Sequence, residues 1–136
     1  MLLILTNNIK EIGRLAEEIE RFGEEENLPL KTTLNLNLVL EELITNTISY
    51  GYSDSEEHLI NVKFERIADS LTVTIEDDGS AFNPLEEPPP VMSDNLDDLE
   101  TGGLGIHLVR KLTDQVFYQR EGDCNILKLV IKLPAA

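Results

Sequence analysis

The sequence predicts an α+β two-layer sandwich, in which helices cover one face of a mixed, largely antiparallel sheet. Two long stretches place apolar residues at intervals of three or four, as amphipathic helices do. Two pairs of segments alternate apolar and polar residues around short connections, which is typical of β-hairpins. Both helical stretches precede the first hairpin, and a third separates the hairpins. This order favours helices packed on one face of a sheet.

The first half of the chain contains a short strand and two helices. The apolar residues 2–5 predict an edge strand. Asn8 and Glu11 resemble a helix N-cap with its reciprocal glutamate, and the helix that follows is expected to end at Pro29. A second helix is predicted over residues 33–50, where apolar side chains cover most of the circumference, as in a buried helix. Its polar sector consists of Asn35, Glu42, Asn46 and Ser49.

The second half contains the two predicted hairpins and the third helix. In chain order, the expected segments are strands at 59–67 and 71–75, a lid loop at about 86–101, a helix at 104–113, and strands at 116–119 and 126–133. The lid holds three consecutive prolines and many acidic residues. We interpret it as a loop within one domain, residues 1–136, because the remaining chain is too short for a second core.

Composition narrows the class of function. The formal net charge of -15 and the pI of about 4.3 argue against binding to a nucleic-acid backbone. A solvated acidic surface explains this charge, and a docking face for a basic partner is the alternative. A single cysteine, Cys124, cannot form an intramolecular disulfide, and no segment approaches the roughly 20 apolar residues that span a bilayer. We expect a cytoplasmic protein with no membrane contact.

Glu42 and Asn46 lie one helical turn apart, so their side chains are neighbours. An amide oxygen can ligate Mg²⁺, which prefers oxygen ligands, and a nearby carboxylate can accept a proton from an attacking hydroxyl group. For this pair taken alone, an ordinary polar contact along a helix is the alternative interpretation. Glu41 points about 100° away and is a weaker candidate.

Two glycine-containing segments add a possible nucleotide site. Asp77-Asp78-Gly79 closes a predicted strand, and Gly102-Gly103-Leu104-Gly105 opens the third helix. The unpaired N–H groups and the positive dipole end of a helix N-terminus favour phosphate binding. Each segment alone is also explained without a ligand, the first as a plain turn and the second as a flexible hinge.

The order and spacing of these segments resemble the ATP-binding domain shared by sensor histidine kinases, type II topoisomerases, Hsp90-type chaperones and MutL-type repair proteins. This GHKL-type domain has the histidine-kinase-like, or Bergerat, fold. Within that group, the short chain is most similar to the anti-sigma-factor serine/threonine kinases of bacterial partner-switching systems. The resemblance covers roughly half of the chain, between Glu42 and Asp114.

The resemblance implies a role for each matching residue. Glu42 would be the general base, and Asn46 would hold Mg²⁺. Asp77 would accept a hydrogen bond from the adenine amino group of ATP or ADP, beside Gly79 and Phe82. The residues expected to cradle the phosphates are Gly102, Gly103, Leu104 and Gly105.

The resemblance also implies a function. Such a kinase would phosphorylate a small antagonist protein of the anti-anti-sigma, STAS type, bind a sigma factor or another regulator, and form a homodimer through its N-terminal strand and helix. This chain departs from the pattern at Ala81, where many members have a second glycine. No Lys or Arg occurs between Glu86 and Gly105, and Thr101 stands where some members have an arginine.

These departures leave two alternatives to an active kinase. The first is a non-catalytic nucleotide-binding module that only sequesters a partner, because transferred charge is usually stabilised by cations. The second is the catalytic half of a histidine kinase, separated from its phosphoacceptor domain. Neither His58 nor His107 lies on a long amphipathic helix that could present a phosphoacceptor.

Overall fold

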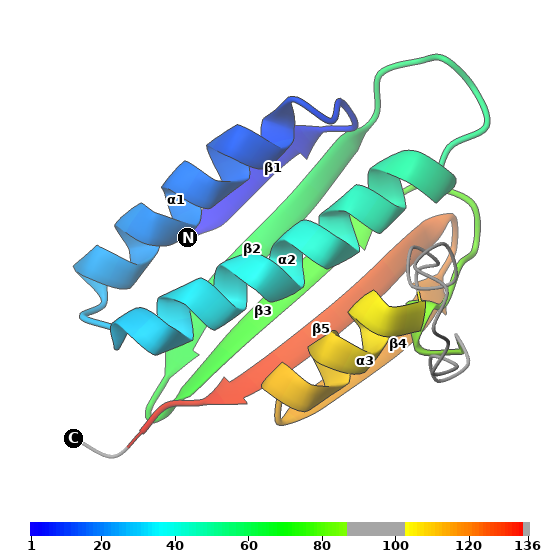
Figure 1. The fold of residues 1–136 in the computed structure, drawn as a ribbon. Coiled ribbons are helices and arrows are strands. Elements are labelled where there is room, and N and C mark those ends of the chain that lie inside the picture. Colours follow the sequence, from blue (N-terminus) through cyan, green and yellow to red (C-terminus); the bar gives the residue numbers. More distant parts are fainter. Residues whose placement is uncertain (87–102, 135–136) are drawn as a thin grey trace, which may run out of the picture.

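The structure, a computed structural model, describes residues 1–86 and 103–134. Figure 1 shows one sheet with three helices lying across one of its faces, so the described part of the chain has two layers. The strand order is β1-β2-β3-β5-β4, and every pair of neighbours is antiparallel. The predicted fold class is confirmed, with antiparallel ladders throughout the described sheet.

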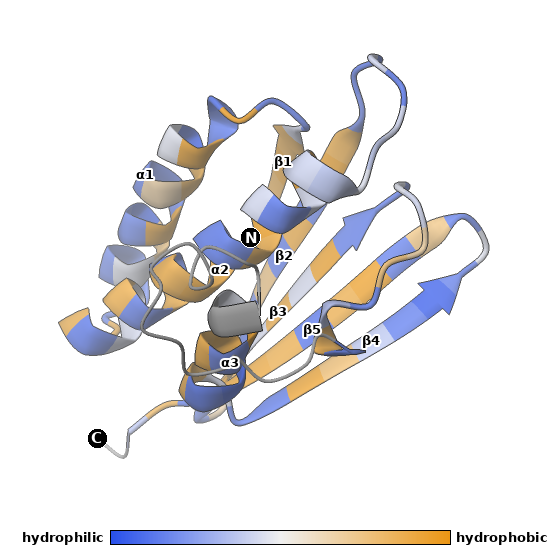
Figure 2. Cartoon of the chain, turned by 45° about the vertical axis from the view of Figure 1, so that its right-hand side comes forward, coloured by the Kyte–Doolittle hydropathy of each residue, from blue (hydrophilic) through white to orange (hydrophobic). Residues whose placement is uncertain are grey.

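The five strands agree closely with the predicted segments. They are β1 (Leu2–Thr6), β2 (Leu59–Ile67), β3 (Ser70–Asp77), β4 (Gln115–Glu121) and β5 (Cys124–Lys132). In the three inner strands, alternate residues are buried under the helices, as the apolar alternation predicts. Figure 2 shows this alternation as bands of apolar and polar colour along the sheet.

The three helices are α1 (Glu11–Glu25), α2 (Leu30–Tyr50) and α3 (Gly103–Leu112), and a 3₁₀ turn, η1, covers Pro84–Glu86. Helix α2 begins three residues earlier than predicted, because Pro29 serves as its N-cap with an extended ψ of 143°. Among the described side chains of α3, Ile106 and Val109 are buried, whereas Leu108 is only half-buried.

The two ends of α1 differ in how well the sequence predicts them. Asn8 Oδ1 accepts a hydrogen bond from the Lys10 N–H, but Glu11 does not return to Asn8. Its carboxylate accepts from the Thr6 N–H at 3.0 Å, and this bond lowers the pKa of Glu11. The predicted capping box is therefore wrong, because the glutamate caps the end of β1 instead. At the other end, Asn27 adopts a left-handed φ of 52° in a Schellman turn.

The core lies between the helices and the sheet and consists mainly of Leu, Ile and Val. Phe22 of α1 and Phe64 of β2 are its fully buried aromatic pair, with ring centroids 5.2 Å apart. Within the described part of the chain, no helix has both the length and the apolar character needed to cross a membrane. Strand β3 is central in the sheet, so Asp77 at its end is placed by ladders on both sides.

Candidate functional site

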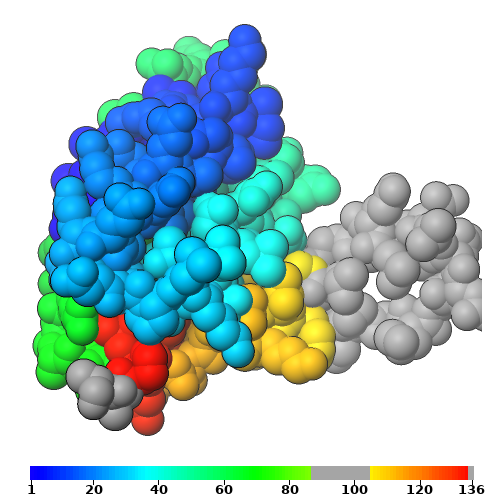
Figure 3. Space-filling model, turned by 60° about the vertical axis from the view of Figure 1, so that its left-hand side comes forward, coloured from blue at the N-terminus to red at the C-terminus, as the bar shows by residue number. Residues whose placement is uncertain are grey.

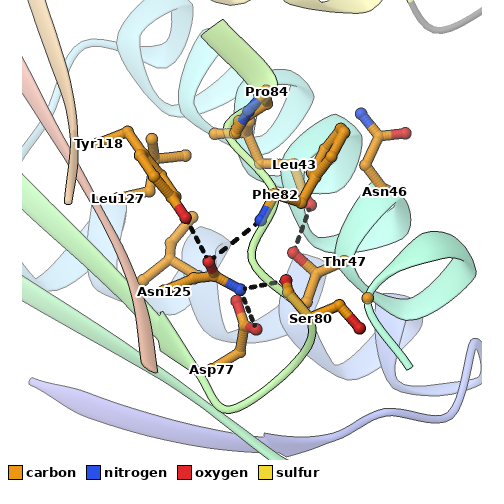
Figure 4. A pocket seen from close by; sticks show the side chains of 12 residues that line it. Leu43, Asn46, Thr47, Asp77, Ser80, Phe82, Pro84, Tyr118, Asn125 and Leu127 are labelled. Carbon is orange, nitrogen blue, oxygen red and sulfur yellow. Dashed lines mark hydrogen bonds between the residues drawn. The ribbon is translucent and has the colours of Figure 1, made fainter. Parts of the chain in front are cut away.

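A narrow pocket lies where the end of β3 meets the C-terminal half of α2. Its walls come from α2, from the segment after β3, and from β4 and β5, as Figure 4 shows. The lining residues are Leu43, Asn46, Thr47, Gly51, Ile75, Asp77, Ser80, Phe82, Pro84, Tyr118, Asn125 and Leu127. The structure thus brings three predicted site residues, Asn46, Asp77 and Phe82, to one pocket.

Asp77 is a buried carboxylate at the pocket floor, with 7% of its surface exposed. Its Oδ1 accepts hydrogen bonds from the Gly79 N–H at 2.9 Å and from the Asn125 amide at 3.0 Å. Buried carboxylates need such partners, because an unpaired buried charge is strongly unfavourable. Both bonds use the same oxygen, so the carboxylate keeps acceptor capacity for a ligand that presents an N–H or O–H donor.

Asn125 of β5 joins four parts of the pocket wall. Its amide N–H₂ also donates to the Ser80 carbonyl at 2.9 Å, and its oxygen accepts from the Phe82 N–H at 3.3 Å and from the Tyr118 hydroxyl at 2.5 Å. These bonds appear as dashed lines in Figure 4. Only 7% of Asn125 is exposed, so the network is largely shielded from water. Asn125 therefore holds the Asp77 carboxylate and the segment at 80–82 in place.

Gly79 is required by a close approach of two backbone segments. A Cβ atom there would lie 2.6 Å from the Gly51 carbonyl oxygen and 2.9 Å from Asp77 Oδ1. The neighbouring Ser80 N–H donates to the same Gly51 carbonyl at 2.7 Å, and the Arg120 guanidinium donates to the Gly79 carbonyl at 2.7 Å. The turn after β3 is thus fixed from two sides, by the end of α2 and by β4.

Glu42 and Asn46 form a hydrogen-bonded pair beside the pocket. The Asn46 amide donates to Glu42 Oε1 at 3.2 Å, which leaves the Asn46 oxygen as an acceptor. Both side chains are half-buried. Gly105 in the first turns of α3 lies against the Glu42 carboxylate, because a Cβ on Gly105 would overlap it. The glycine segment therefore meets the Glu42–Asn46 pair directly.

The remaining predicted residues divide into those that the structure describes and those outside it. Gly103 and Leu104 belong to the first turn of α3, whereas Gly102 and Thr101 lie outside the described residues, as does the predicted lid apart from Glu86. Arg110 of α3 donates to the Leu85 carbonyl, which ties this helix to η1. Glu41 is exposed, in agreement with its lower rank as a candidate.

Asp78, for which the sequence indicates no role, forms an ion pair with His58. His58 Nδ1 lies 3.1 Å from Asp78 Oδ1, and Nε2 lies 2.8 Å from Asp54 Oδ1. Tyr52 stacks on the imidazole ring with centroids 4.4 Å apart. The hydrogen bond and charge of Asp54, and then those of Asp78, raise the pKa of His58. A protonated His58 donates to both carboxylates and joins the loop after α2 to the turn after β3.

The sequence does not predict Tyr118, Asn125 or Arg120 as site residues. Each lies in the final hairpin, far along the chain from Asp77, and none belongs to a recognisable motif. The observed register of β3 and β5 places Asn125 opposite Asp77, but the predicted strands at 71–75 and 126–133 include neither residue. A polar residue at a position facing the core needs a partner, and here that partner is the Asp77 carboxylate.

Comparisons with known proteins agree with this geometry. A family model described as the histidine kinase-like ATPase domain matches residues 5–131. The serine/threonine-protein kinase BtrW of Bordetella bronchiseptica is 28% identical over 94 residues, which cover 69% of this chain and 66% of BtrW. The serine-protein kinase RsbW of Staphylococcus aureus is 29% identical over 94 residues, which cover 65% of this chain and 59% of RsbW. The matched region is thus less than two thirds of either relative.

A solved structure gives the same fold. The histidine kinase domain of the blue-light activated histidine kinase from Erythrobacter litoralis EL346 matches with a TM-score of 0.56 and 22% identity, covering 92% of this chain and 60% of that one. The family resemblance inferred from the motifs is confirmed, since residues 5–131, which the family model matches, contain all three motif segments. The chain belongs to the histidine kinase-like ATPase domain family.

Proposed function

We propose that this chain is an ATP- and Mg²⁺-dependent serine/threonine protein kinase of the partner-switching type. It would phosphorylate a small STAS-type antagonist protein and bind a sigma factor or another regulator. The observation that carries the proposal is the meeting of the three motifs: Asn46 and Asp77 line one pocket, and Glu42 touches both Asn46 and Gly105. The names of BtrW and RsbW, both serine kinases, support the reaction class.

The residues present fit a nucleotide and a magnesium ion. Asn46 would offer its amide oxygen to Mg²⁺, since its N–H₂ group already donates to Glu42. In the described part of the chain, no three His, Cys, Asp or Glu side chains gather as a metal site. Mg²⁺ is often held by one or two protein ligands together with waters and substrate phosphates, so the Asn46 oxygen would be a sufficient protein contact. Bound Mg²⁺ would neutralise charge on the phosphates.

We assign a role to each residue on this basis. Asp77 would accept a hydrogen bond from the adenine amino group, and Phe82 would line the base-binding part of the pocket. Gly79 and Gly105 leave room where a side chain would collide with Gly51 and Glu42 respectively. Glu42 would accept the proton of the substrate hydroxyl, because it is a half-buried carboxylate beside the glycine segment.

The pocket must widen to admit a base. Its volume is about 30 Å³, too small for a purine base. Phe82 precedes η1 and Pro84 is its first residue, and this segment is tied to the rest of the domain by the bond from the Phe82 N–H to Asn125 and by the bond from Arg110 to the Leu85 carbonyl. We expect this segment to move outward on nucleotide binding while Asp77 keeps its place.

Thermal unfolding tests the nucleotide site. We expect ATP with Mg²⁺ to raise the Tm of the wild-type protein. At a ligand concentration of 100 Kd, binding should add about 2.7 kcal/mol to the free energy of unfolding. Asn46→Ala should abolish the effect of Mg²⁺ while ADP alone still binds. If neither ATP nor ADP, with or without Mg²⁺, changes the Tm of the wild-type protein, the proposal is refuted.

Phosphoryl transfer then separates the kinase from a non-catalytic module. Two observations favour the non-catalytic module, because each leaves fewer cations for the transferred phosphate. The Arg110 guanidinium is already hydrogen-bonded to the Leu85 carbonyl, and the sequence has no Lys or Arg between Glu86 and Gly105. Labelled ATP is incubated with candidate STAS-type proteins and with wild type or Glu42→Gln. Transfer that is lost in Glu42→Gln supports the kinase. Nucleotide binding and partner binding without transfer in either protein would support the module.

We also propose a cytoplasmic homodimer that forms through β1 and α1. Strand β1 is an edge of the sheet and pairs only with β2 among the described strands. Its side chains Leu2 and Ile4 are 60% and 45% exposed, so the strand presents an apolar edge that can pair or pack with a second copy. A monomeric mass in light scattering at high protein concentration would contradict the dimer.

A further inference from the structure

An apolar ridge runs along the outer side of α2. Leu30, Leu34 and Leu38 are 74%, 59% and 46% exposed, although they belong to a helix whose opposite side is completely buried. Residues four apart on a helix are neighbours, so the three leucines form one continuous ridge over two turns. The core residues of α2 point toward the sheet, and the ridge therefore contributes nothing to the core.

Three adjacent exposed leucines are more than the scattered apolar residues of an ordinary protein surface. A single exposed leucine needs no explanation, but a contiguous apolar patch with a polar rim marks an interaction site. The spacing of four residues matches the anchor spacing by which a helix packs against another helix. A partner helix packed along α2 could therefore contact all three leucines at once.

The rim of the ridge is acidic. Leu30 lines a hollow of about 440 Å³ between α1 and α2 together with Glu20 and Glu24. Gly23 brings the two helices close at this point, because a Cβ there would overlap the side chain of Thr33. Figure 3 shows the outer faces of α1 in blue and α2 in cyan, which lie side by side.

The acidic rim continues past the other end of the ridge. Glu41 is exposed one turn beyond Leu38, Lys31 adjoins Leu30 on the same helix, and α3, which packs against α2, carries Arg110 and Lys111 in its last turn. The molecule carries a net charge of -15, and the hollow at the Leu30 end of the ridge is lined by two carboxylates and by no Lys or Arg. Complementary charge at the rim of an interface selects the partner and speeds association.

We propose that the Leu30–Leu34–Leu38 ridge docks an amphipathic helix of a partner protein, with apolar residues on one face and Lys or Arg on its flanks. The charge of the rim disfavours nucleic acid and anionic lipid, since both are negatively charged. Nucleotide is not needed for this contact: the ridge lies on the outer side of α2, whereas Leu43 and Asn46 of the same helix face the pocket. The inference holds whether or not the chain is a kinase.

The test uses a synthetic probe and a pair of matched variants. The probe is an 18-residue amphipathic peptide of Leu and Lys, and its control has every Leu replaced by Ala at the same charge. Leu34→Asp removes the middle of the ridge. Ile67→Asp makes a comparable apolar-to-acidic change at a residue 61% exposed at the end of β2, so it adds the same charge elsewhere.

We expect the Leu-Lys peptide to bind the wild type and Ile67→Asp equally, and Leu34→Asp about tenfold or more weakly, as for loss of a central anchor. In ¹H–¹⁵N spectra, the shifts should concentrate on residues 20–41 and should be absent with the Ala-Lys peptide. Three outcomes would overturn the proposal. The affinity for the Leu-Lys peptide could fall by the same factor in Leu34→Asp and Ile67→Asp, or the Ala-Lys peptide could bind the wild type as tightly as the Leu-Lys peptide. The chemical-shift changes could also be spread over the whole acidic surface. A change of oligomeric mass in Leu34→Asp would also overturn it, because a second copy would then occupy the ridge. Unchanged circular dichroism and Tm exclude misfolding of this exposed-site variant.

Discussion

Replacement of Asn125 by leucine tests the network that holds Asp77 in place. The two side chains have the same branched arrangement of heavy atoms, and leucine is the larger, so the change removes hydrogen bonds without opening a cavity. Four hydrogen bonds are lost, to Asp77 Oδ1, the Ser80 carbonyl, the Phe82 N–H and the Tyr118 hydroxyl. Asp77 keeps its bond from the Gly79 N–H, but it loses a donor to a buried carboxylate.

The expected magnitude follows from which groups remain without a partner. A buried polar group left unpaired costs about 1–3 kcal/mol, and water can replace Asn125 at the half-buried groups. We therefore expect a loss of about 3 kcal/mol in the free energy of unfolding, a large part of the roughly 5–15 kcal/mol typical of a domain. Tyr118→Phe removes one of the four bonds and should cost about 1 kcal/mol.

Urea unfolding of the four proteins of a double-mutant cycle measures these values. The matched control is Asn61→Leu, the same chemical change at a half-buried position on the opposite face of the sheet. In the Asn125→Leu background, Tyr118→Phe should cost almost nothing, because the hydroxyl has already lost its partner. A cost for Asn125→Leu no larger than that for Asn61→Leu would show that the network contributes no net stability.

Two further predictions concern Gly105 and His58. Gly105→Val should displace the Glu42 carboxylate, since even a Cβ overlaps it. It should lower phosphoryl transfer at least tenfold, whereas the affinity for adenosine, which would reach Asp77 without any phosphate, should change little in calorimetry. Retained transfer would contradict the contact. For His58, the raised pKa means that the ion pairs stabilise the folded state fully below the ordinary imidazole pKa of about 6.5, and that this stabilisation is lost as the pH rises through the raised pKa. The pKa of Asp54 is lowered by the same hydrogen bond, so its contribution is lost only in acid. The stability difference between wild type and His58→Gln should therefore decrease as the pH rises above about 6.5, and NMR titration of the His58 ring should give a pKa above that of a free imidazole. A difference that is constant or grows with rising pH would refute the ion-pair interpretation.

The strands and the motifs could be predicted from the sequence because their signals are local. The alternation at 59–67 defines β2 to the residue, and Glu42 with Asn46 is fixed by helical spacing alone. The start of α2 was predicted late, because Leu30 is exposed and adds nothing to the apolar periodicity. The predicted capping bond between Glu11 and Asn8 is wrong, because the Glu11 carboxylate instead accepts a hydrogen bond from the Thr6 N–H at the end of β1.

The parts of the site that could not be predicted depend on contacts between distant segments. Asn125 lies 48 residues from Asp77, and His58 lies 20 residues from Asp78. No local pattern identifies either pair, since each depends on the register and the packing of several elements. The reason for Gly79 also emerges only in three dimensions: the residue is glycine because the Gly51 backbone approaches it, whereas the sequence indicates only a turn.

The hydrogen bond from the Ser80 N–H to the Gly51 carbonyl links the two halves of the pocket mechanically. Gly51 is the C-cap of the helix that carries Asn46, and Ser80 follows the turn that carries Asp77. A shift of the C-terminal end of α2 would therefore act directly on the turn that follows β3. By thermodynamic linkage, a ligand group that shifts α2 must change the affinity at Asp77 by the same factor as a group at Asp77 changes the affinity at Asn46. Gly51 and Ser80 both line the pocket, so the backbone contact that would couple the two subsites is part of the pocket wall itself.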